Sequence, residues 1–209
     1  MDTYQEDSNE KTILKVAEKL FLQNGYSGTS TTEIAKEVGC NQALIHYYFR
    51  TKENLFNSIF EQKFKVFFQN IFILNDQKPQ TFTEKLKQLI EAHFDLISKN
   101  PKLPLLIINE LSRKKEHVNS MREKLQNIPE KLLSELNTGL EIEIAAGRIR
   151  SMELRDLIIS ILSLNISLFL LMPIVEELLP LNGEEKIKLI AHRRKEHVDI
   201  ILNNLKPII

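Results

Sequence analysis

The chain has 209 residues, of which 43% are hydrophobic and 27% charged, with 28 acidic and 28 basic side chains. This composition is typical of a globular protein and excludes a largely disordered one. Because the formal net charge is zero, any surface that binds a polyanion must carry its positive charge locally. The single cysteine, Cys40, excludes a disulfide within the chain and favours a reducing, cytoplasmic setting.

Two helices are predicted before residue 40. Apolar residues recur at helical spacing from about residue 8 to residue 24, and Gly25 follows as a typical C-terminal stop. Ser30 and Glu33 have the spacing of a capping box, in which each side chain accepts a hydrogen bond from the backbone of the other residue. A short helix is therefore predicted to begin there, and Gly39 is expected to end it.

Two further helix starts follow closely. Asn41 is a good N-cap for a short helix through Phe49, because its side-chain oxygen can accept a hydrogen bond from a first-turn N–H. Thr51 is expected to cap a long fourth helix over residues 52–74, whose phenylalanines form a wide apolar face. The short helix that Asn41 opens contains neither Lys nor Arg.

The rest of the chain is also predicted to be helical, with Pro129 inside or breaking one of the helices. The predicted helices cover residues 81–99, 105–114, 117–147, 152–179 and 184–205. The expected fold class is therefore all-α. Residues 1–50 are predicted to form an N-terminal three-helix domain, and residues 51–209 a larger helical domain.

The run from Leu157 to Val175 carries no charged residue and is nearly long enough for a transmembrane helix. However, serines, Asn165 and Pro173 interrupt the run, and its flanks are acidic rather than basic. The preferred interpretation is a helix surrounded by other helices, with no membrane partner. Its apolar area exceeds what a monomer of this size leaves exposed, so the last two helices are predicted to form a homodimer interface.

The second and third predicted helices are joined by a turn of about three residues, which is helix-turn-helix spacing. In that motif the later helix lies in the major groove of DNA. The segment TSTTEIAKEVGCNQALIHYYFRTKENLF resembles the DNA-binding motif of the tetracycline-repressor (TetR) family. The matching positions are Ile34, Ala35, Gly39, Cys40, Asn41, Ala43, Ile45, Tyr48, Phe49, Thr51, Lys52, Glu53 and Leu55. The resemblance covers about residues 10–60, and beyond them only the length and the helical pattern match.

This resemblance implies DNA contacts from both short helices and from the start of the fourth. The helix-turn-helix would be an N-terminal DNA-binding domain, followed by a ligand-binding and dimerisation domain. The second helix would place its first residues near phosphate, and the third would present its first residues to base edges, where glutamine can pair with adenine. The implied set is Thr31, Thr32, Asn41, Gln42, Ala43, Leu44, His46, Tyr47 and Lys52. His46 stands where the family usually has tyrosine, and it could donate to a phosphate as that residue does.

An effector site is expected among the long helices, and its pocket should be mainly hydrophobic. Polar residues inside apolar helices are the more informative candidates, because a buried polar group needs a partner. The alternative for each of them is a structural role. The candidate set is Phe64, Phe68, His93, Asn109, Asn165 and Phe169.

The resulting hypothesis is a one-component transcriptional regulator, most simply a repressor. It would bind a palindromic operator in double-stranded DNA as a homodimer, and a small apolar or amphipathic ligand would release it. The alternative is a DNA-bound organising or division protein of the same fold without a small-molecule effector. An enzyme is not expected, because the sequence has no nucleophile elbow and no phosphate-binding glycine loop.

No cofactor and no metal site are predicted. The two histidines near the C-terminus, His192 and His197, do not have the i, i+4 spacing that would place two metal ligands on one helix face. The charged residues between them are interpreted as a solvated face.

Overall fold

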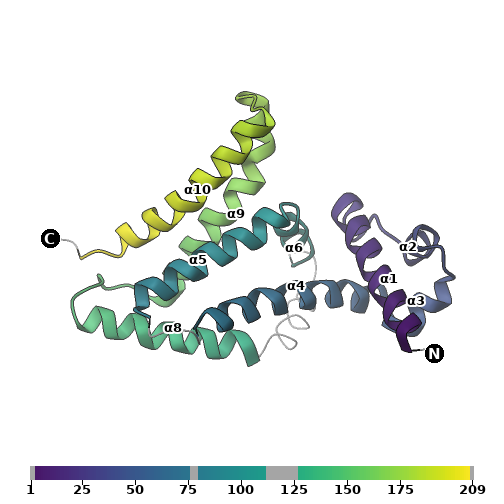
Figure 1. Cartoon of the computed structure of the whole chain (residues 1–209), viewed down its shortest axis with the longest axis horizontal. Coiled ribbons are helices and arrows are strands. Elements are labelled where there is room, and N and C mark those ends of the chain that lie inside the picture. The colour runs from purple at the N-terminus through teal and green to yellow at the C-terminus, as the bar shows by residue number, and fades with distance from the viewer. Residues whose placement is uncertain (1–2, 76–79, 112–126, 208–209) are drawn as a thin grey trace. The chain divides into compact units, whose positions relative to one another are not determined.

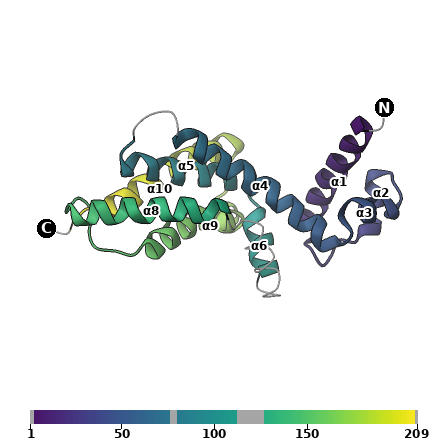
Figure 2. The ribbon, with the colours of Figure 1, turned by 90° about the horizontal axis from the view of Figure 1, so that it is seen from below.

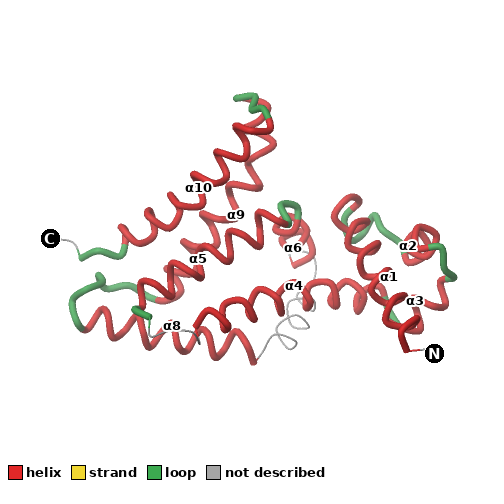
Figure 3. The backbone as a smooth tube through the Cα atoms, viewed as in Figure 1, coloured by secondary structure: helices red, strands yellow, loops and turns green. Residues whose placement is uncertain are grey.

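The computed structural model describes the backbone of residues 3–75, 80–111 and 127–207, and the side chains of residues 9–63, 80–108, 130 and 132–207. Within these residues every regular element is an α-helix and no strand occurs (Figure 3), so the predicted all-α class is confirmed. The chain divides into two compact units. The first comprises residues 1–66 and 105–124, and the second comprises residues 67–104 and 125–209.

The first unit contains α1 (Thr3–Asn24), α2 (Thr31–Val38), α3 (Gln42–Phe49) and the beginning of α4 (Lys52–Asn75) (Figure 1). The helix α1 begins five residues before the predicted start at residue 8. The unit is held together by a core of buried apolar side chains that these helices share. Its members include Ile13, Ala17, Phe21, Ile34, Ala35, Ile45, Phe49, Leu55, Phe56 and Ile59.

Aromatic rings join the start of α4 to the end of α1. The Phe56 ring packs edge-on against Phe21 and Tyr26, with ring centroids 5.2 Å and 4.9 Å apart. The first unit therefore continues past residue 50 into α4. The domain boundary placed at residue 50 stays a prediction.

The second unit contains α5 (Phe82–Lys99), α8 (Asn127–Ala145), α9 (Leu154–Leu178) and α10 (Gly183–Asn204), whereas α6 (Leu103–Leu111) belongs to the first unit from Leu105 onward. The helix α5 contacts α8, α9 and α10, and α9 also contacts α8 and α10 (Figures 1 and 2). Because α5 meets all three neighbours, one continuous stripe along it is buried. The stripe comprises Phe82, Leu86, Ile90, His93, Phe94 and Ile97.

Several helix starts differ by one or more residues from the expected ones. The helix α6 begins at Leu103, two residues before its predicted start. Within the described residues Pro129 lies in the first turn of α8, where the missing N–H has no partner to lose. The predicted segment from residue 117 to residue 126 lies outside the described residues.

The helix α9 is long and apolar enough to cross a membrane by length and composition, with a mean hydropathy of 2.4 over its most apolar window. One face packs against α5 and α10 through Leu157, Ile161, Asn165 and Phe169, which recur every four residues. Another face leaves large apolar side chains exposed, namely Ile159, Leu162, Leu171, Ile174 and Leu178. The helix is therefore covered on one side only within a single chain, not surrounded as expected.

Candidate DNA-binding site and buried polar cluster

The N-termini of α2 and α3 are capped as predicted. The Ser30 hydroxyl accepts a hydrogen bond from the Glu33 N–H at 3.0 Å, and the Glu33 carboxylate accepts one from the Ser30 N–H, so the capping box is formed. The Asn41 side-chain oxygen accepts the Leu44 N–H at 2.9 Å. The first-turn N–H groups that these caps leave over are available to an anion such as a DNA phosphate.

The turn between α2 and α3 is fixed by Gly39. Its φ of +79° is a left-handed conformation that favours glycine, and its N–H bonds back to the carbonyls of Ala35 and Lys36. Cys40 follows half-buried, and burial raises the pKa of its thiol. This turn brings the first residues of α3 beside the first residues of α2.

The structure brings three predicted DNA-contacting residues together at this point. The Gln42 side-chain N–H donates to the Thr31 hydroxyl at 2.9 Å, and the Thr32 hydroxyl donates to the Gln42 side-chain oxygen at 3.2 Å. The neighbouring side chain of Ala43 is exposed, and that of Leu44 is half-buried. The first turn of α3 therefore presents a polar group, held from α2, next to apolar side chains.

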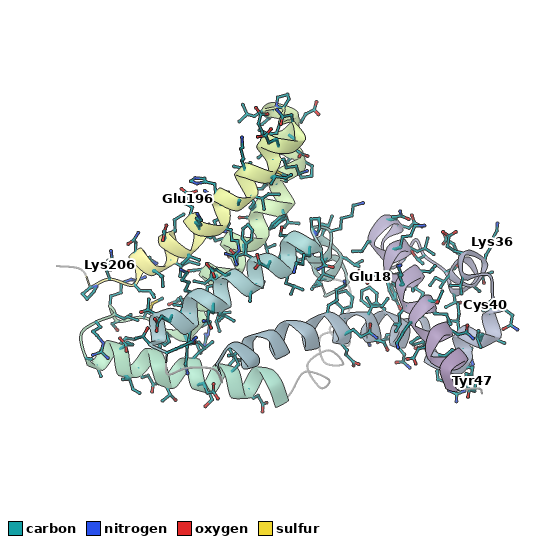
Figure 4. All side chains as sticks on the ribbon, viewed as in Figure 1. Glu18, Lys36, Cys40, Tyr47, Glu196 and Lys206 are labelled. Carbon is teal, nitrogen blue, oxygen red and sulfur yellow. The ribbon has the colours of Figure 1, made fainter. Side chains whose placement is uncertain are left out.

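The helix α3 has one buried and one exposed face. Ile45 and Phe49 are buried in the core, whereas His46 is exposed and the Tyr47 side chain is 60% exposed. Lys36 of α2, Cys40 of the turn and Tyr47 of α3 are labelled at one end of the first unit in Figure 4. The exposed face of α3 therefore carries polar and aromatic side chains and neither Lys nor Arg.

The Lys52 side chain makes contacts within the protein itself. Its ammonium donates to the Thr29 carbonyl oxygen at 2.7 Å and lies 4.2 Å from the centroid of the Tyr26 ring. The Thr29 hydroxyl in turn bonds to the backbone at the end of α1, at the Leu20 and Gly25 carbonyls. Lys52 thus ties the first residue of α4 to the segment that precedes α2. Its contact with phosphate stays a prediction.

Arg50 lies between α3 and α4 and has a backbone conformation that is unfavourable for a residue with a side chain. Its φ of +65° lies in the left-handed region, and Arg50 is the one non-glycine residue with positive φ in the described part of the chain. The Thr51 N–H donates to the Phe49 carbonyl at 2.7 Å across it, which closes a three-residue turn. A strained arginine next to the recognition helix is typical of a functional position.

Of the predicted effector contacts, His93 and Asn165 lie together in the core of the second unit. The fully buried Asn165 amide donates from Nδ2 to the Ile90 carbonyl at 3.0 Å and to His93 Nδ1 at 3.1 Å. Its Oδ1 accepts from Nδ1 of His197 at 2.8 Å. One amide therefore joins α5, α9 and α10, and the polar cluster of His93, Asn165 and His197 is fully inside the unit.

The bond from Asn165 requires a neutral His93, and the lowered pKa of each ring makes both histidines neutral at pH 7. His93 accepts at Nδ1, so its proton is on Nε2, whereas His197 donates from Nδ1 and keeps a lone pair on a buried Nε2 that has no partner. Burial lowers the pKa of His93 to about 4. Burial and the nearby Arg193 guanidinium lower the pKa of His197 to about 4, against the opposing effect of Glu196.

The sequence interpretation missed His197. His192 is exposed, but His197 is fully buried on the other side of α10. The Arg194 guanidinium, expected on a solvated face, is partly exposed and forms a bidentate pair with Asp95 of α5 at 2.8 Å and 2.9 Å. Only the four-residue spacing of His197 from the buried Ile201 could have indicated its burial.

Of the other predicted effector contacts, only the Phe169 side chain is among the described residues. Phe169 is buried against Phe94, with ring centroids 5.4 Å apart, and belongs to the packed core. The side chains of Phe64, Phe68 and Asn109 lie outside the described residues.

Grooves also lie between helices in the described part of the second unit. One of about 360 Å³ lies between α9 and α10 and is lined mainly by Met152, Ser160, Ser163, Ser167, Ile200 and Asn204. Another of about 320 Å³ lies between α8 and α9, with Asn137, Glu141, Ile144 and Arg155 in its lining. Neither groove is lined by His93, Asn165 or Phe169.

The paired short helices with capped N-termini and an exposed recognition face define a helix-turn-helix DNA-binding protein. The family described as "Bacterial regulatory proteins, tetR family" matches residues 13–59, and "Tetracyclin repressor-like, C-terminal domain" matches residues 83–201. The chain belongs to the TetR family of transcriptional regulators, as the resemblance predicted. It is a DNA-binding regulator and not an enzyme.

Relatives of known role share parts of the chain. The fatty acid metabolism regulator protein of Bacillus subtilis is 28% identical over 138 residues, which is 66% of this chain and 69% of that protein. The negative transcriptional regulator IcaR of the biofilm operon in Staphylococcus aureus is 36% identical over 88 residues, covering 40% and 45% of the two chains. The crystal structure of FadR from Bacillus subtilis in complex with stearoyl-CoA has a TM-score of 0.69 at 21% identity, covering 93% of this chain and 98% of that one.

Proposed function

We propose that the protein is a homodimeric, one-component repressor that acts in the cytoplasm, binds a palindromic operator and leaves it when a small amphipathic ligand binds. The observation that carries the proposal is the helix-turn-helix with its two capped starts and an exposed first turn of α3. A relative that is a negative regulator supports the direction of the effect. Ligand and DNA then weaken each other by the same factor.

On the DNA side, Thr31, Thr32 and Asn41 lie at helix N-termini that can meet phosphates, and Gln42, Ala43 and Leu44 face base edges. His46 and Tyr47 are proposed to contact the sugar-phosphate backbone, together with Lys52. Few of these residues carry a fixed charge. The salt dependence of DNA binding should therefore be shallow, because the slope follows the number of phosphates neutralised by Lys and Arg.

The homodimer is proposed to form through α9 and α10. Their exposed apolar side chains include Ile159, Leu162, Ile174 and Ile200, at 40% to 57% exposure, and so much clustered apolar surface is unusual for a monomer. A two-fold contact buries the same patch on both subunits and relates two recognition helices to the two halves of a palindrome. The apolar length of α9, which resembles a membrane span by composition, is explained by this contact.

The ligand is proposed to be apolar or amphipathic, and a long-chain acyl thioester of coenzyme A is the first candidate. The support is the similarity to a fatty acid metabolism regulator and to a regulator solved with stearoyl-CoA. The proposed pocket wall contains Phe64, Phe68 and Asn109, supported from the core by His93, Asn165 and Phe169. The cluster of His93 and Asn165 would then respond to the ligand through packing, because both side chains already have hydrogen-bond partners.

A footprint on the promoter DNA of its own gene tests the proposal. The expected result is protection of two half-sites about one helical turn apart, lost when stearoyl-CoA is added and kept when free coenzyme A is added. Absence of any sequence-specific protection at moderate salt would refute the proposal that the protein binds an operator. Protection that no acyl-CoA or fatty acid relieves, from a protein that also purifies without bound lipid, would favour the alternative of a DNA-bound organising protein without an effector.

A further inference from the structure

The side chain of Gln42 is held before any DNA is present. Gln42 is the first residue of α3, and its carboxamide bridges two adjacent hydroxyls at the start of α2. Its N–H donates to Thr31 at 2.9 Å, and its oxygen accepts from Thr32 at 3.2 Å. Both ends of the amide are therefore fixed by one neighbouring helix, although all three residues are at least partly exposed to solvent.

The bridge leaves a defined hydrogen-bonding pattern. A glutamine amide has two N–H donors and two acceptor lone pairs, and the bonds to Thr31 and Thr32 use one of each. One N–H and one lone pair remain, and adenine presents groups of the matching kinds, an N7 acceptor and an N6 amino donor, in the major groove. The Gln42 side chain has three rotatable bonds, and fixing them on DNA binding would cost conformational entropy. Because Thr31 and Thr32 already hold the side chain, that entropy cost of binding is smaller.

We propose that Thr32 is a positioning residue for base recognition, and that with Thr31 it holds Gln42 as a preset reader of one A·T base pair in each operator half-site. The inference rests on the proposed function, in which Gln42 faces base edges. Thr31 and Thr32 differ in whether the hydroxyl hydrogen is used. Thr31 accepts a hydrogen bond from Gln42, so its own O–H can still donate to a phosphate, whereas the Thr32 O–H already donates to Gln42.

The bridge has little to do with holding the fold. The α2 and α3 helices are fixed by the capping box at Ser30, the Gly39 turn and buried residues such as Ile34 and Ile45. Hydrogen bonds between exposed side chains compete with water and add little stability. Removing the Thr32 hydroxyl is therefore expected to change which base pair is preferred, with the folded structure kept.

The experiment uses the full-length protein and duplexes that it selects from a randomised DNA library. Wild type is compared with Thr32→Val, which removes the hydroxyl at nearly constant shape, with Thr32→Ser, which restores it, and with Gln42→Ala. Thr138→Val, at an exposed threonine on α8 in the second unit, is the matched control. Binding is measured on the selected duplex and on variants that carry G·C in place of A·T at each single position.

Wild type is expected to disfavour the change at one A·T pair per half-site about tenfold or more, and Gln42→Ala is expected to lose this preference. Thr32→Val should reduce the preference at that pair about fivefold, as expected for one hydrogen bond, while Thr32→Ser and Thr138→Val keep it. Thermal unfolding should be unchanged in all four variants.

Two results would overturn the inference while the proposed function stands. One is a preference in Thr32→Val equal to that of wild type at the pair that Gln42→Ala affects. The other is an equal loss of affinity by Thr32→Val for every duplex, which would make Thr32 a plain phosphate contact. If Gln42→Ala changes the preference at no position, the base contacts in the proposed function are themselves wrong.

Discussion

The buried amide of Asn165 joins three helices of the second unit, so its replacement should destabilise that unit. Asn165→Leu keeps a side chain of similar length but removes three hydrogen bonds, to Ile90, His93 and His197. It leaves two buried groups unpaired, the Nδ1 lone pair of His93 and the Nδ1–H of His197. Each unpaired buried group costs about 1–3 kcal/mol, so we expect the free energy of unfolding to fall by about 4 kcal/mol.

Urea unfolding followed by circular dichroism measures this loss, at one fixed protein concentration because dimerisation contributes to apparent stability. Asn203→Leu, at an exposed position on α10, is the control and should change stability by less than about 0.5 kcal/mol. A loss for Asn165→Leu no larger than that of the control would show that the three bonds contribute nothing net. The reasoning about the cluster would then be wrong.

Asn165→Asp tests the direction of the hydrogen bonds between Asn165 and the two histidines. Aspartate keeps the oxygen that accepts from His197 but replaces the donating NH₂ with a second acceptor, which faces the Nδ1 lone pair of His93. At neutral pH the variant should therefore be less stable than wild type. Protonation of His93 supplies a donor and a positive charge, so the deficit relative to wild type should shrink as the pH falls toward 5. A deficit that is constant with pH would contradict the assigned direction of these hydrogen bonds.

Three further predictions concern histidine titration, Lys52 and Arg50. The pKa values of His93 and His197 are lowered to about 4 in the folded protein, whereas an ordinary histidine has a pKa of 6.5. Between pH 4 and pH 6.5 the unfolded chain therefore binds more protons than the folded one. Stability measured by urea unfolding should thus be complete above pH 6.5 and fall toward pH 4 by about 3 kcal/mol per histidine, and His93→Gln should reduce that fall. Lys52→Met should lower the free energy of unfolding by about 2 kcal/mol, through the lost bond to a backbone carbonyl and the lost cation–π contact, whereas Lys36→Met on the surface of α2 should not. Arg50→Gly should raise stability by about 1 kcal/mol in thermal unfolding, because the strain of its positive φ is relieved.

Each of these has a clear contrary result. Stability that is equal at pH 7 and pH 5 for wild type would contradict the neutral histidine pair. An unchanged stability for Lys52→Met, with a salt slope of DNA binding reduced by about 2 for the dimer, would make Lys52 a phosphate contact alone. An Arg50→Gly variant that is less stable than wild type would show that the positive φ carries no strain.

Features set by local contacts could be predicted from the sequence by itself. The caps at Ser30 and Asn41 bond to a backbone N–H only three residues ahead, and the left-handed turn at Gly39 depends on that residue's own missing side chain. Because the chemistry of such signals is contained in a few consecutive residues, the sequence determined the helix-turn-helix and the family.

Only the tertiary structure decided which distant groups share a hydrogen bond. The partners of Asn165 lie 72 residues before it and 32 residues after it, and Lys52 bonds to a carbonyl 23 residues earlier. Helical periodicity predicts that a side chain faces inward, but it does not specify which residue of another helix stands opposite. The sequence therefore predicts Asn165 as an effector contact and gives His197 no role, whereas the structure joins both in one polar cluster between α5, α9 and α10. The exposed apolar face of α9 became visible for the same reason, because burial depends on the neighbours that the fold supplies.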